Sequence, residues 1–107
     1  MADVKILDVA ALATRLESPG EAFFLDVRTP EEWEMARIEG FRLLDAALVE
    51  TIQALDRDAE LVFLCHHGMR SDAAAQHFAA QGFRNVWNVT GGIDAWSRDV
   101  DPSVPRY

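Results

Sequence analysis

The sequence predicts an α/β fold with a mainly parallel central sheet of about five short strands and helices on both faces. Short apolar runs recur at 4–7, 23–27, 61–64 and 86–89. Segments with helix signals lie between these runs, and this alternation of strand and helix is typical of a parallel sheet. The run at 23–27 is apolar on both of its faces, as a strand in the interior of such a sheet requires.

The first half of the chain contains two helix starts with clear capping residues. Asp8 follows the first strand and can cap a helix. Thr29 suits the N-cap of a second helix, Pro30 suits its first position, and Glu32 can complete a capping box. The second helix is expected to be short. The apolar face of the first helix is expected to comprise Val9, Leu12, Ala13 and Leu16.

The second half of the chain is expected to contain three further helices. Asp45 can cap a helix over 46–55, and a helix over 71–82 places Gly82 at its C′ position. The segment 91–96 opens a short helix, and the tail beyond it is expected to be irregular. The residues expected to face inward are Leu48, Ile52 and Leu55, then Ala74, Ala75, Phe78 and Ala79, and finally Ile93 and Trp96.

Length and charge limit the classes of function. The 107 residues are expected to form one domain over 1–107. Eighteen acidic and ten basic residues give a net charge of −8, which argues against nucleic acid or an anionic membrane as the main partner. No signal peptide or membrane-spanning pattern is evident, and a single cysteine forms no internal disulfide, so a cytoplasmic location is expected.

The single cysteine, Cys65, lies at the carboxyl end of the strand predicted at 61–64 and just before a helix. Ligands collect at this edge of parallel sheets. The first amide groups of the helix are unpaired and carry partial positive charge. If the loop wraps around the sulfur, its N–H groups form an anion cradle, and thiols in such places reach pKa values of roughly 3.5–7.5. Cys65 is therefore the candidate nucleophile.

Other residues of the loop suit an incoming anion. His66, His67 and Arg70 can supply positive charge or hydrogen-bond donors. Gly68 allows a tight turn with a positive φ angle. These residues give the acidic protein a locally positive site next to its only thiol.

The two neighbouring histidines also raise the question of a metal site. His66 and His67 could form a metal site with the cysteine, but adjacent residues rarely converge on one ion and the sequence shows no second ligand cluster. We therefore expect neither a metal nor a cofactor. His77 lies well inside a predicted helix, where a surface or packing role is expected.

Three segments together resemble the rhodanese family of single-domain sulfurtransferases. They are LDVRTPEEW at 25–33, CHHGMRS at 65–71 and GFRNVWNVTGGIDAW at 82–96. The resemblance covers nearly the whole chain and implies a rhodanese-like fold. It also implies that a cysteine thiolate takes the outer sulfur from a donor such as thiosulfate. The resulting persulfide then passes this sulfur to an acceptor such as cyanide or a thiol.

The resemblance assigns a role to each matching residue. Cys65 carries the persulfide, Arg70 and His66 orient the donor, and Asp26 and Arg28 support the structure near the loop. Many members have arginine directly after the cysteine, so His66 implies weaker use of thiosulfate. The residues implied to bind the substrate are His66, His67, Gly68, Met69, Arg70 and Ser71.

Two alternative functions remain open from the sequence. A related phosphatase class carries arginine six positions after the cysteine, but here that position is Ser71 and Arg70 comes one residue too early. A shorter loop favours sulfur over phosphate. The other alternative is a persulfide carrier or binding module that serves a specific protein partner. The expected partners are thus a small anionic sulfur donor and a thiophilic acceptor, with a sulfur-accepting protein as the alternative.

Overall fold

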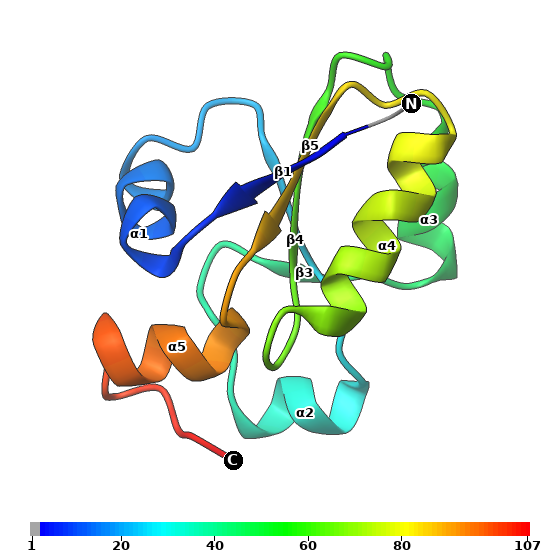
Figure 1. The fold of residues 1–107 in the computed structure, drawn as a ribbon. Helices are drawn as coiled ribbons and strands as arrows, with labels where there is room; N and C mark the ends of the chain where they lie inside the picture. The colour runs from blue at the N-terminus through cyan, green and yellow to red at the C-terminus, as the bar shows by residue number, and fades with distance from the viewer. Residues whose placement is uncertain (1–2) are drawn as a thin grey trace.

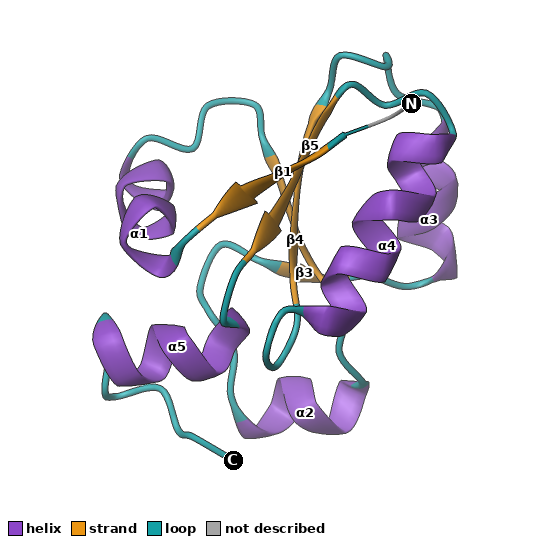
Figure 2. Cartoon of the chain, in the orientation of Figure 1, coloured by secondary structure: helices purple, strands orange, loops and turns teal. Residues whose placement is uncertain are grey.

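A computed structural model describes residues 3–107 as a five-stranded sheet in which all neighbouring strands are parallel (Figures 1 and 2). The strand order is β1-β5-β4-β2-β3. This confirms the predicted fold class. The short edge strand β3 is the one that the sequence did not locate. The strands are β1 (Val4–Leu7), β2 (Phe23–Asp26), β3 (Arg42–Leu43), β4 (Glu60–Leu64) and β5 (Asn85–Val89).

Helices cover both faces of the sheet, as predicted (Figure 2). Residues of α1 and α5 belong to one apolar cluster, and residues of α3 and α4 belong to the other. The short helix α2 follows the carboxyl end of β2. The helices are α1 (Val9–Glu17), α2 (Pro30–Met35), α3 (Ala46–Gln53), α4 (Met69–Ala80) and α5 (Gly92–Asp99).

The central strand β4 joins the two clusters. Because successive side chains of a strand point to opposite faces, Val62 and Leu64 enter the cluster under α1 and α5. Leu61 and Phe63 enter the cluster under α3 and α4. All four residues are fully buried. This double burial fixes the position of the strand end, from which the chain continues directly into Cys65.

The helix ends confirm the predicted caps and correct one start. The side chains of Asp8 and Asp45 accept backbone hydrogen bonds, and the capping box of Thr29 and Glu32 is complete. Helix α4, however, begins at Met69, two residues before the predicted start at 71. The N-cap of α4 is Gly68, in the left-handed conformation and without a side-chain hydrogen bond. Because no capping side chain precedes Met69, the sequence did not indicate this start.

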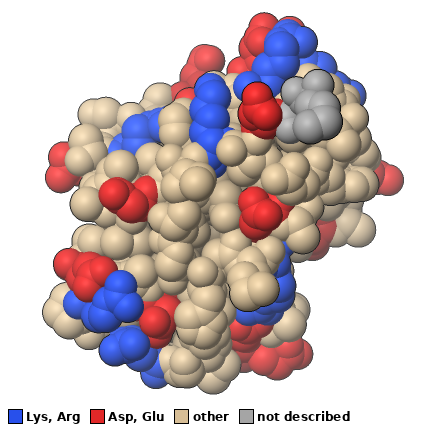
Figure 3. All heavy atoms as spheres, in the orientation of Figure 1, with Lys and Arg blue, Asp and Glu red and all other residues tan. Residues whose placement is uncertain are grey.

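Charged side chains are interspersed over the face of the molecule that Figure 3 shows, with Lys and Arg close to Asp and Glu. Within residues 3–107, no helix is both long enough and apolar enough to cross a membrane.

A buried ion pair fixes the end of β2. The side chains of Asp26 and Arg28 are completely buried and 2.7 Å apart. Arg28 also donates to the carbonyl of Ala36 at 2.6 Å and to the hydroxyl of Tyr107 at 2.8 Å. Burial alone would lower the pKa of Arg28, but the hydrogen bonds to Asp26 and Tyr107 outweigh it and raise the pKa. The pair thus links β2, the end of α2 and the C-terminal segment.

We predict that Arg28→Ala lowers the free energy of unfolding by about 3–5 kcal/mol, because it leaves the carboxylate of Asp26 buried and unpaired. Urea denaturation measures this loss. The matched control is Arg84→Ala, which removes an ion pair with Asp58 whose side chains are 63% and 72% exposed. That change is expected to leave the free energy of unfolding nearly unchanged, because exposed ion pairs contribute little. Equal losses for the two variants would contradict a stabilising role of the buried pair.

Candidate active site

Cys65 begins the loop that connects β4 to α4, and its sulfur is surrounded by hydrogen-bond donors. The residue is 1% exposed. The N–H of Gly68 donates to Sγ at 3.0 Å, and the Ser71 hydroxyl oxygen lies 3.3 Å from Sγ. Gly68 has a φ angle of +105°, as predicted, and a Cβ there would crowd the carbonyl of Val89 at 3.3 Å. The loop conformation that aims an amide at the sulfur therefore needs glycine.

Helix α5 holds the outer side of this loop. The N–H of Ile93 donates to the Cys65 carbonyl at 2.9 Å, and the N–H of Asp94 donates to the His66 carbonyl at 3.1 Å. In a trans peptide the N–H points away from the carbonyl, so these bonds turn the N–H groups of His66 and His67 away from α5. A Cβ on Gly92 would clash with both loop carbonyls. Glycine at this position therefore permits the close contact.

The pKa of Cys65 depends on a competition between burial and hydrogen bonding. Burial alone raises the pKa of the thiol. Hydrogen bonds from the Ser71 side chain and from the backbone of Ser71, Gly68 and His67 outweigh burial, and the pKa lies below its ordinary value. The cradle therefore favours a nucleophilic thiolate.

Asn88 on β5 supports the cradle from the sheet, a role that was not predicted from the sequence. Its Nδ2 donates to the Gly68 carbonyl at 3.0 Å. Its Oδ1 lies 2.5 Å from the hydroxyl oxygen of Ser71, which donates its single proton either to Oδ1 or to the sulfur of Cys65 at any one time. Asn88 thus holds Gly68 and Ser71, two of the residues that donate to Sγ. The sequence feature that could have indicated this role is a polar residue within an apolar strand. Asn88 lies two residues after Val86 and therefore on the same face of the strand.

Arg70 does not point freely into the site. Its guanidinium donates two hydrogen bonds to the carboxylate of Glu32, at 2.7 and 2.9 Å. The hydroxyl of Tyr107 donates to the same carboxylate at 2.6 Å. The hydrogen bond from Arg70 is the main cause that holds the pKa of Glu32 well below its usual range. The sequence assigned Glu32 only to a helix cap, so its second contact was missed.

The ring of His66 stacks on Tyr107 and lies tilted against the ring of His67. The ring centroids of His66 and His67 are 3.9 Å apart, and those of His66 and Tyr107 are 4.0 Å apart. Burial, followed by repulsion from His67, lowers the pKa of His66. His66 is therefore less able to act as a cation near neutral pH than the sequence suggested. The Met69 side chain is 82% exposed.

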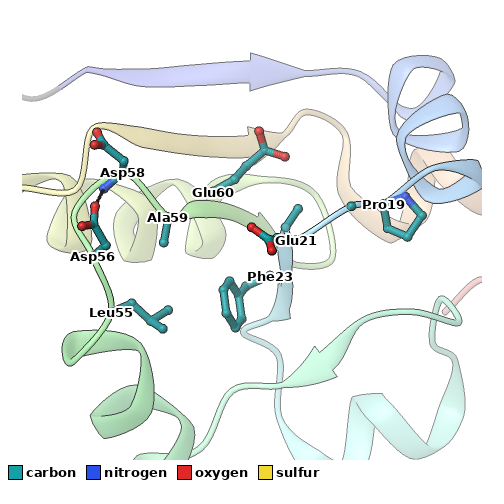
Figure 4. Close-up of a pocket in the computed structure, with 10 residues that line it drawn as sticks. Pro19, Glu21, Phe23, Leu55, Asp56, Asp58, Ala59 and Glu60 are labelled. Atoms are coloured by element: carbon teal, nitrogen blue, oxygen red, sulfur yellow. Dashed lines mark hydrogen bonds between the residues drawn. The ribbon is translucent and has the colours of Figure 1, made fainter.

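A cavity of about 830 Å³ lies at the opposite end of the sheet, beside the starts of β2 and β4 (Figure 4). Phe23, Leu55 and Ala59 contribute its apolar lining, and Glu21 and Asp56 contribute carboxylates. This is the amino end of the strands, whereas ligands of parallel sheets collect at the carboxyl end. The Cys65 loop is therefore the better candidate for a catalytic site.

Known proteins share similarity with nearly the whole chain. The model of the rhodanese-like domain family matches residues 8–99. The chain is 35% identical to a putative sulfurtransferase, YtwF, of Bacillus subtilis, with 94% of this chain and 97% of that protein covered. It is 40% identical to the thiosulfate sulfurtransferase GlpE of Pseudomonas paraeruginosa, over 74% of this chain and 72% of that protein.

A longer relative and two solved structures extend the comparison. The chain is 37% identical to the chloroplastic rhodanese-like/PpiC domain-containing protein 12 of Arabidopsis thaliana. The match covers 97% of this chain but spans only 38% of that protein. A rhodanese-like domain protein from Staphylococcus aureus superposes with a TM-score of 0.75 over 97% of this chain and 99% of that one, at 24% identity. A rhodanese-related protein from Thermoplasma volcanium superposes with a TM-score of 0.73 over 96% of this chain and 99% of that one, at 29% identity.

We predict that Ser71→Ala raises the pKa of Cys65, because the change removes a hydrogen bond that stabilises the thiolate. The rate of alkylation by iodoacetamide as a function of pH reports the pKa, and its midpoint is expected to move to higher pH. Thr14→Ala, which removes an exposed hydroxyl on α1, is the control. Identical midpoints in wild type and Ser71→Ala would contradict this role of the hydroxyl.

Proposed function

The chain belongs to the rhodanese-like domain family, and from this premise we propose that it transfers sulfane sulfur through a persulfide on Cys65. One observation carries the proposal. The backbone N–H of Gly68 and the hydroxyl of Ser71 converge on the sulfur of the only cysteine in the chain. A sulfur held in this way is both a nucleophile and a carrier of negative charge, which are the two properties that sulfur transfer needs.

The proposed reaction has two steps, sulfur uptake from the donor and sulfur transfer to the acceptor. With thiosulfate as the donor, the thiolate of Cys65 attacks the outer sulfur, a new S–S bond forms, and the S–S bond of the donor breaks with its electron pair leaving on sulfite. In the second step an acceptor such as cyanide attacks the outer sulfur. The persulfide bond breaks, thiocyanate leaves and the thiolate is restored. Both steps are nucleophilic displacements, so one cysteine suffices and no separate oxidant is required.

Access to the sulfur requires movement at the loop. Cys65 is 1% exposed, so a donor reaches it only when neighbouring side chains shift. Arg70 borders the site with a side chain that is 47% exposed, and its charge is paired with Glu32. An anionic donor can therefore compete with Glu32 for the Arg70 guanidinium as it enters. This exchange gives Arg70 its proposed role in donor binding.

A persulfide carrier that serves a protein acceptor is the second candidate. It is favoured by Met69, which follows the cradle directly and exposes 82% of its surface. An exposed apolar side chain next to the sulfur suits contact with another protein. Phosphatase activity has weaker support, because Ser71 stands at the position where that class carries arginine. Ser71 is buried against Sγ.

We predict that incubation with thiosulfate adds one sulfur atom to the wild-type protein and that cyanide removes it. Intact mass spectrometry measures both steps. Cys65→Ser is nearly isosteric and is expected to keep its fold, which circular dichroism checks, but to take up no sulfur. A protein that gains no sulfur from thiosulfate or other sulfane donors would contradict the proposed function. Uptake by the Cys65→Ser variant would place the reaction elsewhere.

We also predict that Arg70→Ala raises the KM for thiosulfate by about tenfold or more, as expected for loss of a charge-assisted hydrogen bond of about 1.5–3 kcal/mol. Steady-state formation of thiocyanate provides the measurement. Arg84→Ala is the matched control, because Arg84 also pairs with a single carboxylate, that of Asp58, but lies on the surface away from Cys65. A KM that stays at the wild-type value in Arg70→Ala would exclude donor binding by this residue.

A further inference from the structure

Two elements bring three possible metal ligands together beside the loop. His66 and His67 come from the loop, and Asp94 comes from the first turn of α5. One ligand atom of each residue lies within 4.8 Å of the others. The hydrogen bond from the N–H of Asp94 to the His66 carbonyl fixes this arrangement. Contrary to the expectation from the sequence, the ligand atoms of the adjacent histidines lie close together, and their ring centroids are 3.9 Å apart.

We propose that His66, His67 and Asp94 form a binding site for a divalent transition-metal ion, with zinc as the best-fitting probe. Two imidazole nitrogens and one carboxylate oxygen are ligands that Zn²⁺ uses in three-residue sites, with the fourth position open. Nickel and copper accept the same donors. The hard cations magnesium and calcium prefer sets made only of oxygen atoms, so they fit this site less well.

The three ligand atoms need to move slightly closer together to bind a zinc ion. Zinc bonds of about 2.0–2.1 Å place neighbouring tetrahedral ligand atoms about 3.4 Å apart. Because the three atoms lie within 4.8 Å, they need to approach by little more than about 1 Å. His67 is exposed and can supply this movement by rotating its side chain. His66 is held by its stack on Tyr107, and Asp94 is held by α5.

His66 is already in a state suited to metal binding. Its Nε2 atom is buried and has no hydrogen-bond partner among residues 3–107. An unpaired buried polar atom costs free energy, and a metal ion bound at this nitrogen would satisfy it. The unpaired nitrogen is an observation independent of the clustering of the three residues.

Arg106 competes with a metal for Asp94. Its guanidinium donates to both oxygens of the Asp94 carboxylate, at 3.1 and 3.3 Å. The Arg106 side chain is 55% exposed, and such surface pairs are weak. A metal ion can therefore displace it, and removal of Arg106 should strengthen metal binding. The proposed site therefore predicts that loss of Arg106 increases the affinity for the metal ion.

The test uses untagged protein with Cys65→Ser, so that the thiolate does not bind the metal itself. Isothermal titration with zinc chloride is expected to show one ion per chain. His67→Ala and Asp94→Asn in this background are expected to weaken binding at least tenfold, and Arg106→Ala is expected to strengthen it. The matched control is His77→Ala, which removes an exposed histidine of α4 and is expected to leave the affinity unchanged. Circular dichroism confirms that each variant is folded.

Several results would overturn the site. They are no zinc binding by the Cys65→Ser protein, unchanged affinity in folded His67→Ala, and an equal loss in His77→Ala. Unchanged or weaker binding in Arg106→Ala would likewise remove Asp94 from the ligand set. These measurements do not use sulfur transfer as a readout, so the metal site and the proposed function can fail separately.

Discussion

The Cys65 loop depends on two hydrogen bonds that α5 donates to the carbonyls of Cys65 and His66. They give the first amides of α5 their partners and, because the peptides are trans, direct the following N–H groups away from the helix. Gly92 allows the helix to come this close. Asn88 acts from the sheet, where its side chain holds Gly68 and Ser71. The loop is therefore held from two sides, and its donors meet at one sulfur.

This arrangement explains how a buried sulfur in an acidic protein can carry negative charge. Burial destabilises the thiolate of Cys65, and the net charge of −8 of the protein does not stabilise it. The nearest guanidinium, that of Arg70, is bound by the carboxylate of Glu32, and the pKa of His66 is lowered. Fixed dipoles of the loop, more than the cations that the sequence emphasised, therefore stabilise the charge. In the proposed sulfur transfer, such fixed dipoles would need little reorganisation as negative charge develops on sulfur.

Local signals predicted much of the fold. The caps at Asp8, Thr29 and Asp45 act within four residues, and each was recognised in the sequence. The start of α4 was misplaced because its cap is a backbone conformation of Gly68. Contacts between distant segments were not predicted: Arg70 and Tyr107 meet at Glu32, and Asp94 joins the two histidines, only after the chain has folded. The position of Cys65 was predicted because the end of a buried parallel strand is itself a local pattern.

The most direct test of the cradle is the pKa of the Cys65 thiol in the wild-type protein. The ultraviolet absorbance of the thiolate, followed against pH and corrected with Cys65→Ser, measures it without any substrate. If the loop donors outweigh burial, the midpoint will lie below the value of about 8.5 that is ordinary for a free cysteine. A midpoint at or above that value would show that burial dominates and that the hydrogen bonds of the loop do not sustain a nucleophile.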